Sequence, residues 1–298
     1  MSVVKVNGIG LAKEVAAPAF GRQDIGYSPG GPVDRFSMHV GNLALGNHQW
    51  APALEIIAIG SIEFQQDCLF TLTGAKRQEA RLLENRSSGQ VAVEVAHGSI
   101  VLAREGDCLT LGPPEYGFRT YLCHTRCEAQ DLTDRQRTLL GRTIPKYSEV
   151  CTVGDPENRI RVLRGPEWEF LENPKRFLDP PWMTTMDMSD MGMRLRALAG
   201  AMLGAKRTDI ISAPVNDGTI QLTAKGPIVL LRGRQTIGGY PRIFNVIGSD
   251  IDLLGQYAPN QAIRFTEVSV AEALDIAARK NQDLERFQRR WTAGASRG

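Results

Sequence analysis

A short polar string in the last third of the chain combines residue types that can bind and polarise an amide. The segment 232–243, RGRQTIGGYPRI, directly follows the apolar run PIVLL at 227–231. Arg234 offers a planar fork of N–H groups for a carboxylate or carbonyl oxygen, and Gln235 can both donate and accept a hydrogen bond. Fixed donors of this kind stabilise an oxygen that gains negative charge during the reaction. The string therefore predicts one wall of an amide-binding pocket, with Arg234 and Gln235 as catalytic residues.

The rest of this string suits the same task. A double glycine lets the backbone approach a ligand closely, and a tyrosine hydroxyl can donate a hydrogen bond. The substrate-binding residues predicted here are Thr236, Gly238, Gly239 and Tyr240. The alternative is structural, because arginine and glutamine at a strand end often cap backbone groups, and G-G-Y-P is a good turn sequence.

Two further polar strings are expected beside the first. The string FGRQDIGYSPGGPVDRFSMHVGNLALGN at 20–47 supplies Asp34 and Arg35 as candidate substrate contacts, although Asp34 would equally cap a helix. The string SDMGMRLRAL at 189–198 supplies Arg194 for substrate binding. It also supplies Asp190, which we count with the catalytic residues and expect to orient an arginine rather than to act as a base.

Generic motifs for catalysis and for resident cofactors are missing from the sequence. There is no G-x-S-x-G, H-E-x-x-H or Walker A sequence, and no lysine flanked by methionines in the manner of a biotin attachment site. Cys123, His124 and Cys127 lack a second ligand pair at zinc spacing, so no metal site is expected. If group-carrier chemistry takes place, the carrier is on another chain.

Composition narrows the class of protein. With 298 residues and 42% hydrophobic content, the chain is long enough for one large or two medium globular domains. Its formal charge of +2 excludes the strongly basic surface of a nucleic-acid-binding protein. No segment resembles a membrane span or a signal peptide, and the five cysteines, an odd number, suit reduced thiols. We therefore expect a cytoplasmic protein without membrane or nucleic-acid partners.

The elements that must position the polar strings are mostly short strands. Apolar or alternating runs bounded by Gly, Pro, Asn or Asp occupy 62–75, 90–95, 98–112, 118–125, 159–165, 219–233 and 262–269. Their spacing favours barrels or sandwiches. Helices are expected at 34–47 and at 268–291, the latter opening with a capping box of Ser269 and Glu272. The polar stretch 125–160 predicts a connector with one short helix.

Together the three strings, with ALEI at 53–56, TGA at 73–75 and DIIS at 209–212, resemble the signature sequences of the carboxyltransferase subdomain A and B family. The resemblance runs from about residue 8 to about residue 268. It implies a mainly β fold of two cyclophilin-like β-barrel subdomains with a few short helices and a C-terminal helix. Subdomain A would occupy 1–124, a connector 125–158, subdomain B 159–268, and the C-terminal helix and tail 269–298.

The resemblance also implies a function carried out with partners. Members include the C subunit of bacterial 5-oxoprolinase, which implies a hydrolase subunit in an ATP-dependent complex that opens the cyclic amide 5-oxo-L-proline to L-glutamate. Its partners would be the KipI-like B subunit of 5-oxoprolinase and a protein that resembles the A subunit. ATP would be used by the complex, with no cofactor bound covalently to this chain. One departure is Gly233, because relatives usually carry an acidic residue before the R-Q-T string.

The resemblance leaves two alternatives. The first is the carboxyltransferase component of a biotin-dependent urea-type carboxylase, with biotin on a partner chain. The second is a non-catalytic regulatory subunit that binds a kinase-inhibitor protein.

Overall fold

The computed structural model describes residues 3–8, 10–87, 89–150, 159–198, 203–204 and 206–295. The chain divides into two compact units. The first contains residues 1–17, 35–150 and 282–298, and the second contains residues 18–34 and 151–281. Residues 18–34 thus belong to the second unit and residues 282–298 to the first.

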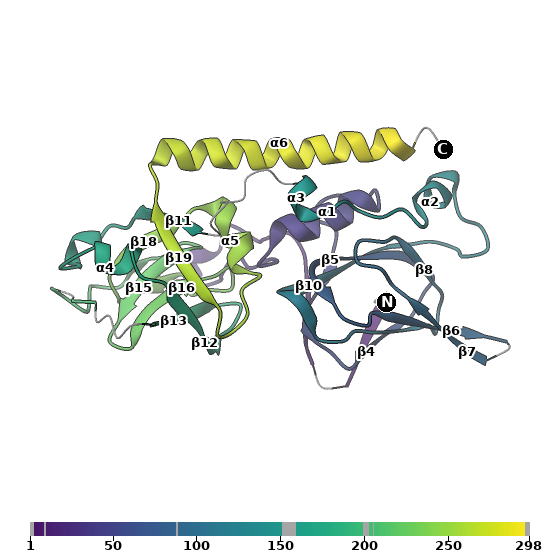
Figure 1. Cartoon of the computed structure of the whole chain (residues 1–298), viewed down its shortest axis with the longest axis horizontal. Coiled ribbons are helices and arrows are strands. Elements are labelled where there is room, and N and C mark those ends of the chain that lie inside the picture. Colours follow the sequence, from purple (N-terminus) through teal and green to yellow (C-terminus); the bar gives the residue numbers. More distant parts are fainter. Residues whose placement is uncertain are drawn as a thin grey trace. The chain divides into compact units, whose positions relative to one another are not determined.

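Two five-stranded sheets form the first unit, shown in purple to teal in Figure 1. One sheet has the order β1 (Val4–Asn7), β4 (Ser61–Phe64), β9 (Cys108–Thr110), β6 (Arg81–Arg86) and β7 (Gly89–Glu94). The other has the order β2 (Leu11–Val15), β3 (Ala53–Ala58), β10 (Pro114–Arg126), β5 (Cys68–Arg77) and β8 (Val101–Ala103). Residues from both sheets, such as Phe64, Leu82, Phe70 and Leu122, share one buried core. The strands expected over this part of the chain are confirmed.

The predicted helix at 34–47 is observed as α1 (Arg35–Ala44), and it packs against β5 and β10 of this unit. Every residue of the helix after Arg35 is buried. The Thr73 hydroxyl donates to the Ser37 carbonyl over 2.8 Å. A side chain at Gly41 would meet the Cys123 sulfur at 2.7 Å, so only glycine permits this close approach. In the predicted connector the structure has two short helices rather than one, α2 (Asp134–Leu139) and α3 (Tyr147–Val150), while residues 151–158 lie outside the described residues.

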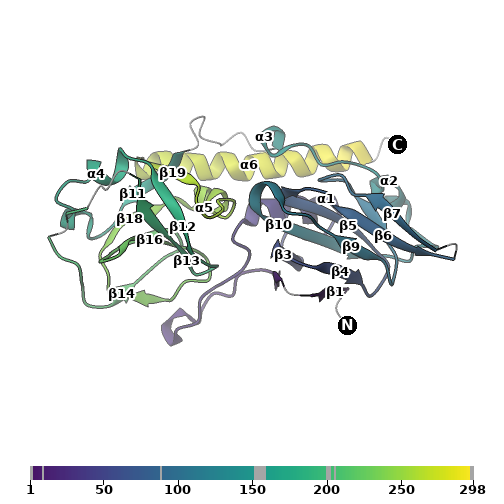
Figure 2. The same ribbon diagram turned by 60° about the horizontal axis from the view of Figure 1, so that its bottom comes forward.

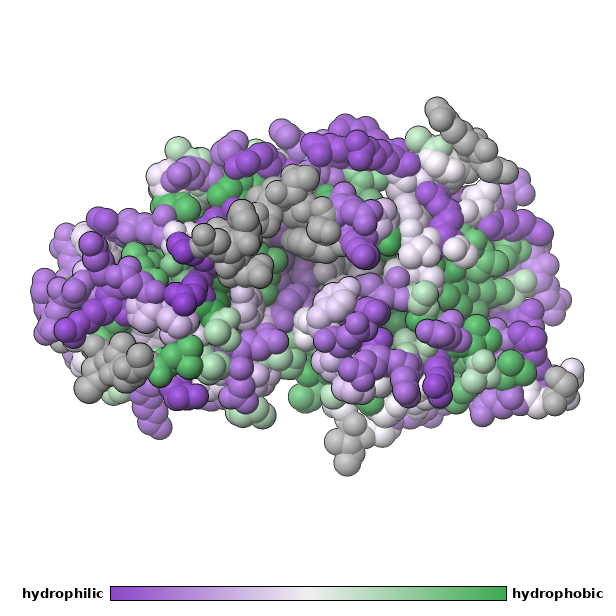
Figure 3. Space-filling model, in the orientation of Figure 1, coloured by the Kyte–Doolittle hydropathy of each residue, from purple (hydrophilic) through white to green (hydrophobic). Residues whose placement is uncertain are grey.

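The C-terminal helix α6 (Val270–Ala295) begins at the predicted capping box. The Glu272 carboxylate accepts from the Ser269 backbone N–H over 2.7 Å, and the Ser269 hydroxyl accepts from the Glu272 N–H over 3.2 Å. The last turns belong to the first unit, where the Trp291 indole N–H donates to the carbonyl of Ala44 over 2.9 Å. Hydrophilic side chains cover the side of α6 that is visible in Figure 3. No helix in the described part of the chain is long and apolar enough to cross a membrane.

The second unit is a closed barrel of seven strands, green in Figure 1 and turned in Figure 2. The ring order is β11 (Arg159–Arg164), β18 (Arg242–Val246), β15 (Thr219–Thr223), β16 (Gly226–Leu230), β13 (Gly192–Ala197), β12 (Trp182–Met188) and β19 (Ala262–Glu267). A parallel pairing of β11 with β19 closes it. The aromatic rings of Phe244 and Phe265 stack on Phe177, and Trp182 packs against Phe177 at a tilt, so that these four side chains fill part of its core. The prediction of a mainly β protein with a C-terminal helix is confirmed.

Smaller elements complete the second unit. These are β14 (Ala213–Pro214) paired with β17 (Ile237–Gly238), the short helices α4 (Lys175–Leu178) and α5 (Gly248–Leu254), and the 3-10 turns η1 (Gln23–Ile25) and η2 (Trp168–Phe170). Helix α5 is fastened to β11 by a buried ion pair, in which the Arg161 guanidinium binds both carboxylate oxygens of Asp250 at 2.8 and 2.5 Å.

Candidate functional site

A pocket of about 210 Å³ on the barrel brings residues of the polar strings at 189–198 and 232–243 together. It is lined by Asp187, Ser189, Met191, Gly192, Arg194, Gln221, Ile228, Leu230, Gln235 and Tyr240. The strand register explains part of this set, because Arg194 of β13 pairs with Ile228 of β16, which pairs in turn with Gln221 of β15. Cross-strand partners share one face of a sheet. The predicted residues Arg194, Gln235 and Tyr240 therefore do meet at one pocket.

Arg194 is held in place on two sides. Its Nε donates to Oδ2 of Asp187 over 2.7 Å, and its Nη1 donates to the Thr223 hydroxyl over 3.2 Å. The arginine side chain is 23% exposed, whereas that of Asp187 is 72% exposed. The guanidinium is thus pre-oriented at the pocket, and its ion pair with Asp187 is open to solvent and worth little energy by itself.

Two glutamines form an amide pair across the pocket wall. The Gln235 side-chain NH₂ donates to Oε1 of Gln221 over 3.4 Å, and the Gln221 NH₂ donates to the carbonyl of Tyr240 over the same distance. Both bonds are long, so a ligand amide can replace them with better geometry. Sequence reasoning missed Gln221, because a polar residue at every second position of TIQLT is the usual pattern of a solvent-facing strand side. Gln221 does not face solvent, because the segment 235–240 covers it and leaves its side chain only 2% exposed.

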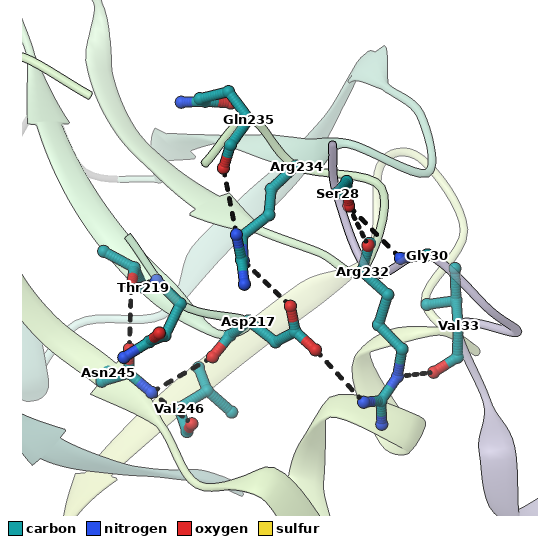
Figure 4. A network of polar contacts seen from close by, with 11 residues as sticks. Ser28, Gly30, Val33, Asp217, Thr219, Arg232, Arg234, Gln235, Asn245 and Val246 are labelled. Atoms are coloured by element: carbon teal, nitrogen blue, oxygen red, sulfur yellow. Dashed lines mark hydrogen bonds and ion pairs between the residues drawn. The ribbon is translucent and has the colours of Figure 1, made fainter. Parts of the chain in front are cut away.

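Arg234 does not line the pocket, contrary to the predicted direct grip on substrate. The residue is 6% exposed, its Nε donates to Oδ1 of Asp217 over 2.9 Å, and its Nη1 donates to the backbone carbonyl of Gln235 over 3.1 Å. Figure 4 shows the guanidinium directed from the turn toward Asp217. The physical reason is charge pairing, since a buried guanidinium without a carboxylate would be strongly destabilising. Its geometry suits positioning Gln235 rather than binding substrate.

Asp217 joins this turn to the rest of the unit (Figure 4). Its second oxygen lies 3.5 Å from Nη1 of Arg232, whose Nε donates to the Val33 carbonyl over 3.0 Å. The Ser28 hydroxyl donates to the carbonyl of Arg232 over 2.9 Å. Residues of the polar string at 20–47 are therefore attached to the base of the string at 232–243. The sequence did not mark Asp217 as a site residue, because N-D-G at 216–218 is a common turn sequence and predicts only a turn.

A buried carboxylate completes the network below Arg232. Asp252 binds Nη2 of Arg232 at 2.8 Å and Nζ of Lys280, on α6, at 2.7 Å. Burial by itself would raise the pKa of Asp252, but the ammonium of Lys280 and the guanidinium of Arg232 bring its pKa down to about 2. The carboxylate is therefore ionised at neutral pH and fixes the orientation of Arg232.

Four other predicted residues make contacts within the fold rather than with the pocket. The carbonyl of Thr236 accepts from the Val215 N–H over 3.0 Å, and that of Gly239 accepts from the Ile210 N–H over 2.9 Å. Asp34 is buried in the second unit, where it accepts from the side-chain NH₂ of Gln256 over 2.7 Å. Arg35 starts α1 in the first unit, with its guanidinium carbon 5.7 Å from the centre of the Trp50 ring. None of these four residues is among those lining the pocket.

Comparison with known proteins identifies the family. The family model for the carboxyltransferase domain, subdomain A and B, matches residues 25–127 and 127–267. This chain belongs to the carboxyltransferase subdomain A and B family. The resemblance noted in the sequence is thereby confirmed.

Two curated relatives of this carboxyltransferase-family chain share one name, that of the C subunit of 5-oxoprolinase. The chain is 33% identical to the Escherichia coli protein of this name, with 90% of each chain covered. It is 27% identical to the Haemophilus influenzae protein, with 91% of this chain and 92% of that protein covered. Among solved structures, the K. lactis urea amidolyase has a TM-score of 0.76 at 18% identity, which shows the shared fold. The match covers 95% of this chain but only 20% of that longer protein.

Gly233 lies directly against Asp190 in this carboxyltransferase-family chain. The Gly233 N–H donates to the Asp190 carbonyl over 2.8 Å. A Cβ at position 233 would lie 3.0 Å from both that oxygen and the carboxyl carbon of Asp190. The Asp190 side chain thus fills the space that a side chain at 233 would need. Asp190 is not among the residues lining the pocket.

Gly238 gives a test of the pocket wall, because a methyl group there would lie 2.4 Å from Nε2 of Gln221. We expect Gly238→Ala to displace the Gln221 amide and to lower any activity of the pocket about tenfold, at a folding cost of about 1–3 kcal/mol. Gly248→Ala is the matched control, since nothing lies within 4 Å of a methyl group at that position. A crystal structure of Gly238→Ala with Gln221 unmoved would contradict the expected displacement.

Proposed function

We propose that this chain is the C subunit of a 5-oxoprolinase-type complex and that the barrel pocket binds the cyclic amide substrate. The observation that carries the proposal is the meeting of Gln221, Gln235 and Arg194 at one pocket. Support comes from the two curated relatives, which carry the name of the 5-oxoprolinase C subunit and are covered over nine-tenths of their length. Their name implies further subunits, which we propose to be the B and A subunits of the same complex.

The chemistry of the pocket fits 5-oxo-L-proline group by group. The lactam presents one N–H donor and one carbonyl acceptor, and a glutamine side chain complements both. The ring also carries a carboxylate, for which a guanidinium is the best-matched partner. In this proposal Gln235 and Gln221 exchange their mutual bond for bonds to the lactam, and Arg194 binds the carboxylate. Tyr240 covers one side of the ring.

The residues below the pocket set the geometry of this proposed reaction. Arg234 fixes the carbonyl of Gln235 and so holds the N–H donor of that side chain at the lactam oxygen. A donor fixed before the reaction stabilises charge that develops on this oxygen when the amide opens. The chain has no Walker A sequence, so we assign use of ATP to the assembled complex rather than to this pocket.

Replacing Gln235 tests the proposed function directly. We expect Gln235→Ala to lower kcat/KM for 5-oxo-L-proline about tenfold, because one hydrogen bond to the substrate is lost. The measurement is 5-oxoproline-dependent ATP hydrolysis, with glutamate release, by the complex of this chain with its B and A subunits. Gln288→Ala, on an exposed turn of α6, is the matched control and should leave the rate unchanged.

The same assay separates the alternatives. A regulatory subunit without catalysis predicts that Gln235→Ala behaves as wild type in every activity of the complex. A urea-type carboxyltransferase predicts no 5-oxoproline-dependent hydrolysis and instead carboxylation of urea when a carboxybiotin carrier is supplied. Either outcome would overturn the proposed function.

A further inference from the structure

Two opposite charges lie side by side in the barrel pocket. Among the described residues that line it, Arg194 and Asp187 are the only two that carry a charge. Nε of Arg194 and Oδ2 of Asp187 are 2.7 Å apart, so the lining of the pocket is neutral as a whole. A neutral site with a fixed cation beside a fixed anion is complementary to a ligand whose own carboxylate and cation are neighbours.

A β-bulge in the hairpin of β12 and β13 places this pair. Between Thr184 and Met188, β12 contains two residues more than the stretch of β13 with which it pairs. The Thr185 hydroxyl fixes both partners at this irregularity, because it donates to the Arg194 carbonyl over 3.1 Å and accepts from the Asp187 N–H over 3.2 Å. Bulges next to functional sites re-aim side chains in this way. The pair is therefore built into the backbone of the hairpin.

Each partner offers a ligand one further polar group. Nη1 of Arg194 donates to the Thr223 hydroxyl, whereas Nη2 makes no hydrogen bond within the described part of the chain. Oδ1 of Asp187 likewise accepts no hydrogen bond from a described residue, and 72% of that side chain is exposed. Since an exposed ion pair contributes little stability, the carboxylate can turn toward a ligand at small cost. A guanidinium donor and a carboxylate acceptor thus stand next to each other at the pocket.

The reaction of the proposed function, on which this inference rests, produces a ligand with matching charges. Hydrolysis of the lactam adds one water molecule and breaks the bond between the carbonyl carbon and the ring nitrogen. The carbonyl carbon becomes a carboxylate, and both protons of the water end on the nitrogen, which becomes an ammonium. This nitrogen and the original carboxylate are bonded to the same carbon atom. The substrate therefore presents a carboxylate beside a neutral N–H, and the product presents a carboxylate beside a cation.

We propose that Arg194 and Asp187 form a subsite for the α-amino acid group of the product L-glutamate, in which Asp187 binds the ammonium. While the ring is closed, the single lactam N–H bonds to the glutamine pair, and Asp187 keeps its bond to Arg194. When the C–N bond has broken, the ammonium has two additional protons, and Oδ1 of Asp187 accepts one of them in a charge-assisted hydrogen bond. The guanidinium holds the neighbouring carboxylate throughout. The pocket therefore distinguishes an amino acid from a carboxylic acid without an amine.

The test compares two ligands that differ only in the ammonium. L-Glutamate and glutarate share the carbon chain and both carboxylates, and glutarate has no amine. In calorimetric titrations of the full chain, we expect the wild type to bind glutamate about fivefold more tightly than glutarate, and Asp187→Asn to abolish this preference. The ratio of the two affinities is the measured quantity, because Asp187→Asn also releases the guanidinium of Arg194 and changes the affinity for both carboxylate ligands by a common factor.

Two control variants separate the roles of the charges. Arg194→Gln should weaken the binding of glutamate and glutarate by the same factor and so keep the preference for glutamate, since both ligands lose the guanidinium. Glu267→Gln, which breaks an exposed ion pair with Arg164 in the same barrel, should leave both affinities unchanged. Thermal unfolding and circular dichroism of each variant check that the barrel is folded.

Turnover of the assembled complex separates this subsite from the proposed function. A preference for glutamate that Asp187→Asn abolishes, in a wild-type complex without 5-oxoproline-dependent ATP hydrolysis, would support the subsite and reject the proposed function. Hydrolysis by the wild-type complex, with the same ratio of affinities in wild type and Asp187→Asn, would leave the proposed function standing and overturn the subsite. Failure of both ligands to bind the wild-type chain would also overturn it.

Discussion

Asp217→Asn is expected to lower the turnover of the assembled complex up to about tenfold, as much as the loss of Gln235 itself, although no residue that lines the pocket is replaced. The substitution keeps the shape of the side chain but removes the charge that pairs with Nε of Arg234 at 2.9 Å and with Arg232 at 3.5 Å. Two guanidiniums then face each other without their shared carboxylate, and Arg234 no longer holds the Gln235 carbonyl in place. Displacement by about 1 Å is enough to withdraw the Gln235 donor from the substrate, so the loss approaches the roughly tenfold effect of removing that donor.

The design of this measurement separates positioning from folding. Glu267→Gln is the matched control, because it breaks an exposed ion pair with Arg164 in the same barrel and should change turnover less than about twofold. We expect Asp217→Asn to affect kcat more than KM, since the substrate contacts of Gln221 and Arg194 remain, and Asp217→Glu to recover part of the lost rate. Wild-type turnover in a folded Asp217→Asn complex would remove Arg234 from the positioning role assigned to it.

How far the sequence predicts this molecule depends on the kind of signal. Strands and helices with a clear period, such as β5, β10 and α1, were predicted because burial of one face imposes a pattern on successive residues. The pair β12 and β13 was not predicted as strands, because the polar residues of TTMDMSDMGMRLRA hide the alternation. One face of that hairpin lines the pocket, so its polar residues serve the site rather than the core.

The candidate site was also predicted only in part. Residue chemistry pointed to Arg234, Gln235 and Arg194, but it could not distinguish Gln235, which lines the pocket, from its buried neighbour Arg234. That distinction depends on Asp217, which is 17 residues from Arg234 in sequence and 2.9 Å from it in space. Likewise, nothing local in 18–34 indicates that Ser28 and Val33 bind the backbone and side chain of Arg232. Long-range charge pairing leaves no periodic trace in a sequence.

The second large effect concerns stability and involves Asp252. We expect Asp252→Asn to lower the free energy of unfolding of the second unit by about 3–5 kcal/mol at pH 7, because it leaves two buried cations, Arg232 and Lys280, without their carboxylate. The measurement is urea unfolding, with hydrogen exchange of barrel peptides to assign the transition to the second unit. The control is Asp275→Asn, which breaks an exposed ion pair with Arg279 on α6 and should lower the free energy of unfolding by less than about 0.5 kcal/mol.

The pH dependence of that loss identifies its cause. Because the two cations outweigh the effect of burial and lower the pKa of Asp252 from its ordinary value of 3.8 to about 2 in the folded chain, its ionised form stabilises the fold fully above pH 4. This contribution, about 2 kcal/mol, falls away as the pH drops from 4 toward 2. The difference in unfolding free energy between wild type and Asp252→Asn should therefore be constant from pH 5 to 8 and shrink on acidification. A difference that stays constant down to pH 2 would mean that packing, rather than the charge on Asp252, holds Arg232 beneath the pocket.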